Sequence, residues 1–323
     1  MSDRYFERVV ALQQRLIEDA RNPTGDQELQ ARLTLPGPEE ATYTPPSARV
    51  VTRTVPGPEG GVTVRVYRPL TEGTGRPLLV WCHGGAFLGG DLDMPEADAV
   101  ARELTVGADA VVVSVDYRLC LGGVHHPAPS DDLIAAVLWT LEHAEGFGAD
   151  PARIGIGGAS AGACLAAGAA LRLRDDGVPP ASVVLAYPIV HPVLPPPSDE
   201  LAGKLAGLSP AMAFAPEVIE PVMENFLGCA SSAAPAYATP GVAKDLRGHP
   251  PTLIINCEYD GLRASGEAYA GQLLDDGVEV RTVLARGVAH GHLNRPALSE
   301  AGRGLRDIGD WITRHRLTGR GEH

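Results

Sequence analysis

The stretch Gly158-Ala159-Ser160-Ala161-Gly162 decides the fold of this chain of 323 residues. The residues before it, 153–157, predict a short buried strand, and the run 163–171 predicts a helix. A G-x-S-x-G sequence between a strand and a helix is typical of a sharp turn that lifts the serine oxygen above a sheet. A Cβ at either glycine would strike neighbouring backbone, and backbone N–H groups at the helix N-terminus can stabilise an oxyanion beside Ser160.

Three further segments carry polar groups directly after apolar strands. Upstream, an apolar run leads into His83-Gly84-Gly85-Ala86-Phe87, whose glycines let the backbone approach a developing negative charge. Downstream, the strand 252–257 precedes Glu258-Tyr259-Asp260, and the strand 278–284 precedes a loop with His290-Gly291-His292. Open α/β sheets bind ligands at these strand ends, and the order serine, acid, histidine along the chain suits a nucleophile and its partners.

Two more motifs complete the pattern, Asp116-Tyr117-Arg118-Leu119 and Asp260-Gly261-Leu262-Arg263. With the segments above, they resemble bacterial hormone-sensitive-lipase-like esterases of the α/β-hydrolase superfamily, from about Val50 to the C-terminus. The resemblance implies an α/β class and an α/β-hydrolase fold, a mostly parallel central sheet flanked by helices, with a helical cap. Its relatives carry Ala-Pro-Glu-His where this chain has the loop 120–127, a departure that puts substrate preference in doubt more than chemistry.

Ser160 is the predicted nucleophile, because a serine hydroxyl attacks well only when a base takes its proton. His290 is the predicted base, and Asp260 is predicted to orient and stabilise its imidazolium. His292 is the alternative base, and Glu258, at the same strand end as Asp260, is the alternative acid. The resemblance favours His290 and Asp260.

The predicted oxyanion hole consists of backbone N–H groups. Those of Gly84, Gly85 or Ala86 would act together with the N–H of Ala161. The family usually has a third glycine where Ala86 stands, and the donor survives this change if the local φ suits alanine. The implied reaction uses no metal and no organic cofactor.

The chain organisation predicts one core with two additions. Alternating strands at 49–55 and 61–69 predict an antiparallel hairpin, and strands then alternate with helices, which indicates a mostly parallel sheet covered on both faces. The long segment 191–247 breaks this alternation, and such connections are usually functional. We therefore predict four parts: a helical arm at 1–47 as the first part of a cap, core at 48–190, the second cap part at 191–247, and core again at 248–323.

Charge and composition exclude other classes. The chain has 27 basic and 40 acidic residues, a net charge of -13 and no basic cluster, which argues against a nucleic-acid partner. Its first residues are charged and are not followed by the apolar core of a signal peptide, and no run is long enough to span a membrane, so we expect a cytoplasmic protein. The five cysteines lack metal-ligand spacing.

The sequence thus predicts a serine hydrolase that cleaves carboxylic esters of short-to-medium acyl groups, or of a small metabolite, through an acyl-enzyme. The expected partner is a small-molecule ester, and the resemblance also implies a possible homodimer through an edge strand. A lactonase, an amidase or an acyltransferase would carry the same three side chains, and a lyase-type enzyme would use the same oxyanion hole. A small-molecule binding protein is a further alternative, which the complete serine, acid and histidine set argues against.

Overall fold

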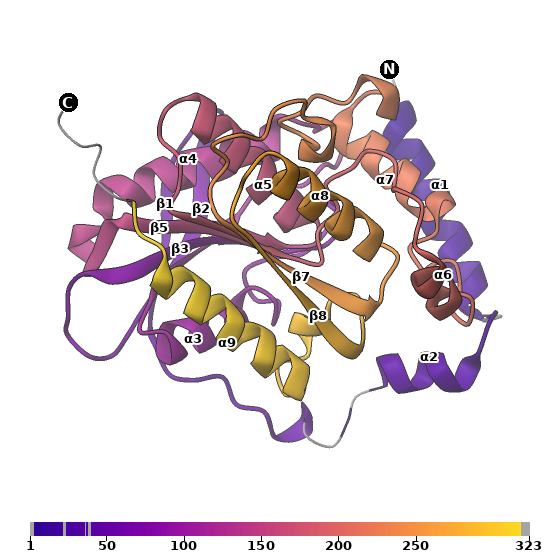
Figure 1. Cartoon of the computed structure of the whole chain (residues 1–323), viewed down its shortest axis with the longest axis horizontal. Coiled ribbons are helices and arrows are strands. Elements are labelled where there is room, and N and C mark those ends of the chain that lie inside the picture. Colours follow the sequence, from indigo (N-terminus) through magenta and orange to yellow (C-terminus); the bar gives the residue numbers. More distant parts are fainter. Residues whose placement is uncertain (1–2, 22–23, 36, 38–39, 318–323) are drawn as a thin grey trace.

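The computed structural model describes residues 3–21, 24–35, 37 and 40–317. Within them lies one eight-stranded sheet in the order β1-β2-β4-β3-β5-β6-β7-β8 (Figure 1). The hairpin partners β1 and β2 are antiparallel, β2 and β4 are antiparallel, and every later pair is parallel. The strands are β1 (Arg49–Gly57), β2 (Gly60–Arg68), β3 (Arg76–Cys82), β4 (Val111–Asp116), β5 (Ala149–Ala159), β6 (Ser182–Ala186), β7 (Thr252–Tyr259) and β8 (Val280–Ala289).

Helices cover both faces of this sheet (Figure 1). Helices α3 (Asp98–Gly107) and α9 (Ser299–Arg314) pack together on one face, whereas α4 (Ala128–His143), α5 (Ala161–Asp175) and α8 (Arg263–Asp275) lie on the other. The mostly parallel sheet flanked by helices that the sequence predicted is therefore confirmed. None of the helices in the described ranges is long and apolar enough to cross a bilayer.

The strand β3 shows why the central strands read as continuous apolar runs. Leu78 and Val80 point into the cluster beneath α4 and α5, whereas Leu79 and Trp81 point into the cluster beneath α3 and α9. All four side chains are fully buried. A strand buried on both faces loses the alternation of polar and apolar residues that a half-exposed strand keeps.

Four helices lie outside the two layers. Helices α1 (Arg4–Arg21) and α2 (Gln27–Thr34) come from the N-terminal arm, and α6 (Asp199–Leu205) and α7 (Pro216–Leu227) come from the insert. In Figure 1, α1, α6 and α7 group at one end of the sheet, and α1 packs along α7. Asn22 and Pro23, between α1 and α2, lie outside the described residues.

Two segments of the insert 191–247 pack against different parts of the molecule. Its last part, 231–247, runs along the core helix α5, where the Cys164 thiol donates to the carbonyl oxygen of Ala238 at 3.1 Å. A Cβ on Gly168 would lie 2.0 Å from the carbonyl oxygen of Tyr237, so the insert's backbone lies flush on α5 at this glycine. The part that carries α6 and α7 lies beside the N-terminal arm, where α7 packs against α1.

Candidate active site

Ser160 lies in the sharp turn between β5 and α5 that the pentapeptide predicted. Its φ is +54° and its ψ is -115°, a backbone conformation that residues other than glycine rarely adopt. A Cβ on Gly158 would lie 2.4 Å from the carbonyl carbon of Gly162, and one on Gly162 would lie 2.3 Å from the carbonyl oxygen of Cys82. Both glycines are therefore required because the turn packs directly against itself and the end of β3.

Three side chains that are far apart in the sequence form a hydrogen-bonded chain at the strand ends. His290, just after β8, has its Nε2 atom 2.8 Å from the Oγ atom of Ser160. The Nδ1 atom of His290 is 2.7 Å from the Oδ2 atom of Asp260, which follows β7. Asp260 is fully buried, and its Oδ1 atom accepts from the N–H of Leu262 at 2.9 Å. The structure thus brings together the three predicted catalytic side chains.

The two alternative residues point elsewhere. The Glu258 carboxylate accepts hydrogen bonds from the Lys204 ammonium at 2.6 Å and from the N–H of Gly287 at 2.6 Å. His292 is buried, and its Nδ1 atom lies 3.2 Å from the Sγ atom of Cys257. Burial lowers the pKa of His292 to about 4, so that its ring is neutral at physiological pH.

The surroundings of His290 tune its basicity. Burial lowers its pKa by penalising the charged form, but the charge of Asp260 and its hydrogen bond outweigh this effect and hold the pKa above its usual range. Aromatic rings fix the imidazole from two sides, with ring centroids 4.4 Å away for Phe214 and 4.9 Å away for Tyr187. His290 is thus both oriented and stabilised as the cation that would form on taking a proton from Ser160.

The predicted oxyanion donors differ in their availability. The N–H of Gly84 already donates to the Oε2 atom of Glu96 at 2.6 Å, so it is not free for an oxyanion, and the prediction is corrected at this position. Within the part of the chain that the structure describes, no acceptor takes the N–H of Gly85, Ala86 or Ala161. Ala86 adopts a φ of +55°, the left-handed conformation that the usual glycine would favour.

The motif around Tyr117 supports the loop after β3. The Tyr117 hydroxyl donates to the carbonyl oxygens of His83 at 2.9 Å and Gly84 at 3.2 Å. Its ring stacks on that of His83, with the centroids 4.5 Å apart. The sequence singled out this motif without a mechanism, and the structure shows that it holds the backbone which carries the candidate oxyanion donors.

An apolar cavity of about 250 Å³ opens onto Ser160. Helix α1 contributes Val9, Leu12, Gln13 and Leu16 to its lining, and helix α7 contributes Val218, Ile219 and Val222. Ala86 and Ala161, two of the candidate oxyanion donors, also line it. No Asp, Glu, Lys, Arg or His side chain is among its described lining residues, so the cavity suits an uncharged group.

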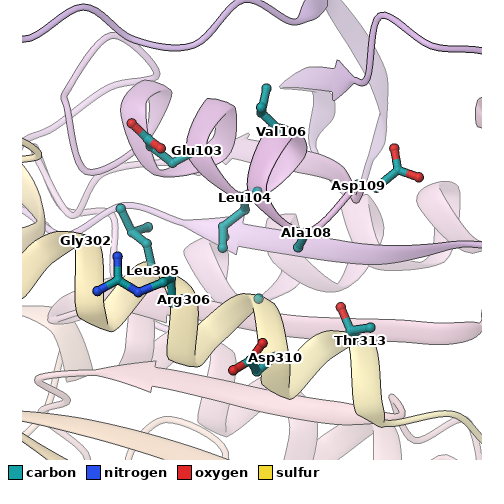
Figure 2. Close-up of a pocket in the computed structure, with 12 residues that line it drawn as sticks. Glu103, Leu104, Val106, Ala108, Asp109, Gly302, Leu305, Arg306, Asp310 and Thr313 are labelled. Carbon is teal, nitrogen blue, oxygen red and sulfur yellow. The ribbon is translucent and has the colours of Figure 1, made fainter.

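A larger groove of about 650 Å³ lies between α3 and α9, away from this cavity. Figure 2 shows its border, with Glu103 and Asp109 on the α3 side and Arg306 and Asp310 on α9. None of these described lining residues is a serine, cysteine or histidine. This groove is larger than the cavity at Ser160, but its described lining residues include no nucleophile or base of the kind found there. We therefore place the candidate active site at the smaller cavity.

The loop 120–127, where the chain departs from the family pattern, contacts α7. The N–H of His126 donates to the carbonyl oxygen of Phe226 at 2.7 Å, and the Asn225 amide donates to the carbonyl oxygen of Cys120 at 2.9 Å. Phe226 in turn stacks on Phe87, with ring centroids 3.9 Å apart. The loop therefore holds the end of a helix that walls the cavity, a contact that the sequence did not indicate.

Comparison with known proteins agrees with this arrangement. The sequence model of one family, described as alpha/beta hydrolase fold, matches residues 79–294. The chain is 37% identical over 273 residues to the esterase LipI of Mycobacterium tuberculosis, which covers 80% of this chain and 81% of that protein. It is 38% identical over 278 residues to the carboxylesterase NlhH of the same species, and this alignment covers 80% of this chain and 82% of that protein.

Solved structures give the same result. The thermostable carboxylesterase EstE1, cloned from a metagenomic library, superposes with a TM-score of 0.76 at 31% identity, covering 88% of this chain and 93% of that one. The hyperthermophilic esterase of Pyrobaculum calidifontis superposes with a TM-score of 0.73 at 33% identity, covering 85% and 88%. Both likenesses extend over most of each chain.

Proposed function

The chain belongs to the α/β-hydrolase fold family, and we propose from the geometry at Ser160 that it is a serine esterase acting through an acyl-enzyme. Its activity is the hydrolysis of carboxylic esters, and its resemblance to the hormone-sensitive-lipase-like esterases is confirmed. The observation that carries the proposal is the hydrogen-bonded chain from Ser160 through His290 to Asp260, at the mouth of an apolar cavity.

The first half of the reaction makes an acyl-enzyme. The Oγ atom of Ser160 attacks the ester carbonyl carbon while its proton passes to the Nε2 atom of His290. The carbonyl oxygen becomes an oxyanion, which accepts hydrogen bonds from the free N–H groups of Ala161 and of Gly85 or Ala86. The bond to the alcohol oxygen then breaks, and the leaving alcohol takes the proton from His290.

The second half releases the acid. Water attacks the acyl carbonyl while His290 accepts one of its protons. The second tetrahedral intermediate then collapses to the carboxylic acid, the bond to the Oγ atom of Ser160 breaks, and His290 returns the proton to that oxygen. The buried Asp260 carboxylate stabilises the imidazolium in both halves. An oxyanion donor of this kind contributes about 3 kcal/mol to transition-state stabilisation, so two or three donors and an oriented base account for a large part of catalysis.

The acyl group occupies the cavity between α1 and α7 in this proposal. The volume of about 250 Å³ lies just below the usual range of ligand pockets, which favours short-to-medium acyl chains or a compact metabolite. The N-terminal arm and the part of the insert with α6 and α7 act as the two pieces of a cap, because both α1 and α7 supply cavity walls. The core consists of the remaining described residues, including the end of the insert on α5.

Two further features belong to the proposal. Strand β8 is an edge strand of the sheet, and we propose that a second copy of the chain pairs there as a homodimer. Sedimentation equilibrium measures this directly, since a monomer at all concentrations would contradict it. A cytoplasmic location stays a prediction of the sequence.

Hydrolysis of p-nitrophenyl esters of increasing acyl length, by wild type beside Ser160→Ala, tests the esterase activity. We expect turnover to be lost by at least about 10⁴-fold in the variant, because nothing replaces the nucleophile. The chain-length profile of the wild type should fall beyond medium acyl chains. A Ser160→Ala protein that still turns over these esters would contradict the acyl-enzyme mechanism.

A further inference from the structure

A second buried carboxylate lies beside the candidate oxyanion loop. Glu96, between β3 and α3, is only 2% exposed, and a carboxylate so deeply buried needs donors for its oxygens. The N–H of Gly84 reaches its Oε2 atom at 2.6 Å. The Tyr187 hydroxyl and the Asn294 side-chain amide reach its Oε1 atom at 2.5 Å and 3.0 Å. No part of the reaction described above uses this group.

The three donors come from three different strand ends. Gly84 belongs to the loop after β3, and Tyr187 follows β6 and packs edge-on against the ring of His290. Asn294 lies four residues after His290, and its Oδ1 atom also accepts from the backbone N–H of Glu96 at 3.3 Å. Glu96 therefore joins the loop that carries the oxyanion donors to Tyr187, which packs against the catalytic base, and to the segment that follows this base in the chain.

We propose that Glu96 is a positioning residue of the ester hydrolysis, whose carboxylate fixes the loop of Gly85 and Ala86 relative to His290. The inference rests on the proposed esterase activity. Oxyanion donors are effective only when they are held at the place where the charge develops, and a misplacement of about 1 Å can cost about 100-fold in rate. Three hydrogen bonds to one buried group provide this rigidity.

The close contact at Gly84 supports this role. A Cβ on Gly84 would lie 2.5 Å from the Oε2 atom of Glu96, so the carboxylate lies flush against the loop backbone. Glycine is thus required at this position for the contact with Glu96, and the donors that remain free are those of the next two residues. The same charge adds to that of Asp260 in raising the pKa of His290 against the effect of burial.

The test is Glu96→Gln, which keeps the shape of the side chain but removes its charge and turns one acceptor into a donor. We expect kcat per active site to fall about 10- to 100-fold with KM within about threefold of wild type, because the loop loses its fixed position. The acid limb of the pH profile should also move to lower pH, since one of the charges that raise the pKa of His290 is gone. Glu258→Gln is the matched control, because this glutamate binds Lys204 and Gly287 instead, and it should change neither quantity.

Two further measurements separate this inference from the activity itself. Active sites are counted by stoichiometric phosphonylation, and the titration of the His290 ring is followed by NMR in wild type and Glu96→Gln. A variant with lower thermal stability but unchanged kcat per active site and an unmoved His290 titration would overturn the positioning role. If the wild type hydrolyses no ester, the proposed function fails, whereas the NMR titration still tests the coupling of Glu96 to His290.

If Glu96→Gln does not fold, Tyr187→Phe provides the test. It removes one donor from the Glu96 carboxylate but keeps the aromatic ring against His290. We expect kcat per active site to fall severalfold, about 3- to 10-fold, as the loop loosens. A kcat equal to that of wild type would overturn the proposal.

Discussion

The proposed reacting groups lie at the carboxyl edge of the sheet, whereas the cavity in front of them is walled in part by α1 and α7, two helices outside the two layers. At the sheet edge, Ser160, Asp260 and His290 follow β5, β7 and β8, and they are joined by hydrogen bonds of 2.7 to 2.8 Å. In the helical cover, α1 and α7 meet the cavity with aliphatic side chains and are tied together by the Arg8–Glu224 ion pair. In the proposed reaction, the two regions contact the same substrate with different kinds of interaction.

From this difference we expect the sheet edge to determine the rate of the reaction and the helical cover to determine which substrates fit. Hydrogen bonds between buried groups have narrow geometric limits, so changes at the sheet edge should act on kcat. Apolar contacts are less directional. Shortening an aliphatic side chain of the cavity wall should therefore change which substrates fit more than it changes the rate of the chemical step. Four experiments follow from this contrast, beginning with the largest expected effect.

Asp260→Asn should cost most, because the amide cannot hold the His290 ring in the tautomer that accepts the serine proton. We expect kcat to fall about 10⁴-fold with the fold intact, as measured by active-site titration and ester hydrolysis. Glu258→Gln, two residues away but bound to Lys204, should stay close to wild type. Equal losses in the two variants would contradict the assignment of Asp260.

Gly162→Ala should show how little space the turn at Ser160 leaves. The added Cβ would lie 2.3 Å from the carbonyl oxygen of Cys82, which is backbone and cannot move aside easily. We expect a loss of about 3 kcal/mol in the free energy of unfolding, measured in urea. Gly271→Ala in α8 is the control, since nothing lies within 4 Å of its Cβ and alanine favours helix. Equal stability of the two variants would disprove the tight contact.

Leu12→Ala tests the helical cover. Leu12 is 4% exposed and lines the cavity from α1, so its truncation lengthens the room for the acyl chain. We expect the ratio of kcat/KM for longer over shorter acyl esters to rise about tenfold. Val10→Ala lies on the same helix at a position that is 36% exposed and should leave this ratio unchanged. An unaltered ratio in Leu12→Ala would show that acyl chains do not occupy this cavity.

The pH profile gives the smallest effect. His290 must be neutral to accept the proton of Ser160, so activity is lost as the pH falls through the pKa of His290. Because that pKa is raised, the acid limb of kcat/KM should lie above the usual histidine value of about 6.5. Leu12→Ala should have the same limb as wild type, since the cavity wall carries no charge. A limb well below 6.5 in the wild type would contradict the influence of Asp260.

Much of the site follows from short stretches of sequence. The turn at Ser160 depends on five residues whose backbone leaves no room for side chains at two positions, so a local pattern is sufficient to identify it. The mostly parallel sheet can be predicted in the same way from apolar strands that alternate with helices. Strands of such a sheet are buried on both faces, so their sequences are almost entirely apolar. Because Ser160, Asp260 and His290 each come directly after a parallel strand, they are expected at one edge of the sheet.

The choice between near neighbours rested on the resemblance alone until the tertiary structure showed where each side chain points. The pairing of β7 with β8 shifts register between Cys257 and Tyr259, next to Asp260. Gly291, which lies between His290 and His292, has a φ of +76°. Such backbone features aim side chains two residues apart in different directions, which spacing along the chain does not reveal. The commitment of the Gly84 N–H to Glu96 is also invisible in the sequence, because burial and distant partners create it.

The sequence by itself therefore determined the fold class and the kind of chemistry and indicated the candidate nucleophile, since these depend on local backbone constraints and on the order of the elements. The tertiary structure alone decided which N–H groups are free, which helices wall the cavity and which buried carboxylates surround His290. These contacts join residues as far apart as Glu96 and Asn294, and only the packing of separate strand ends brings such residues within hydrogen-bond distance.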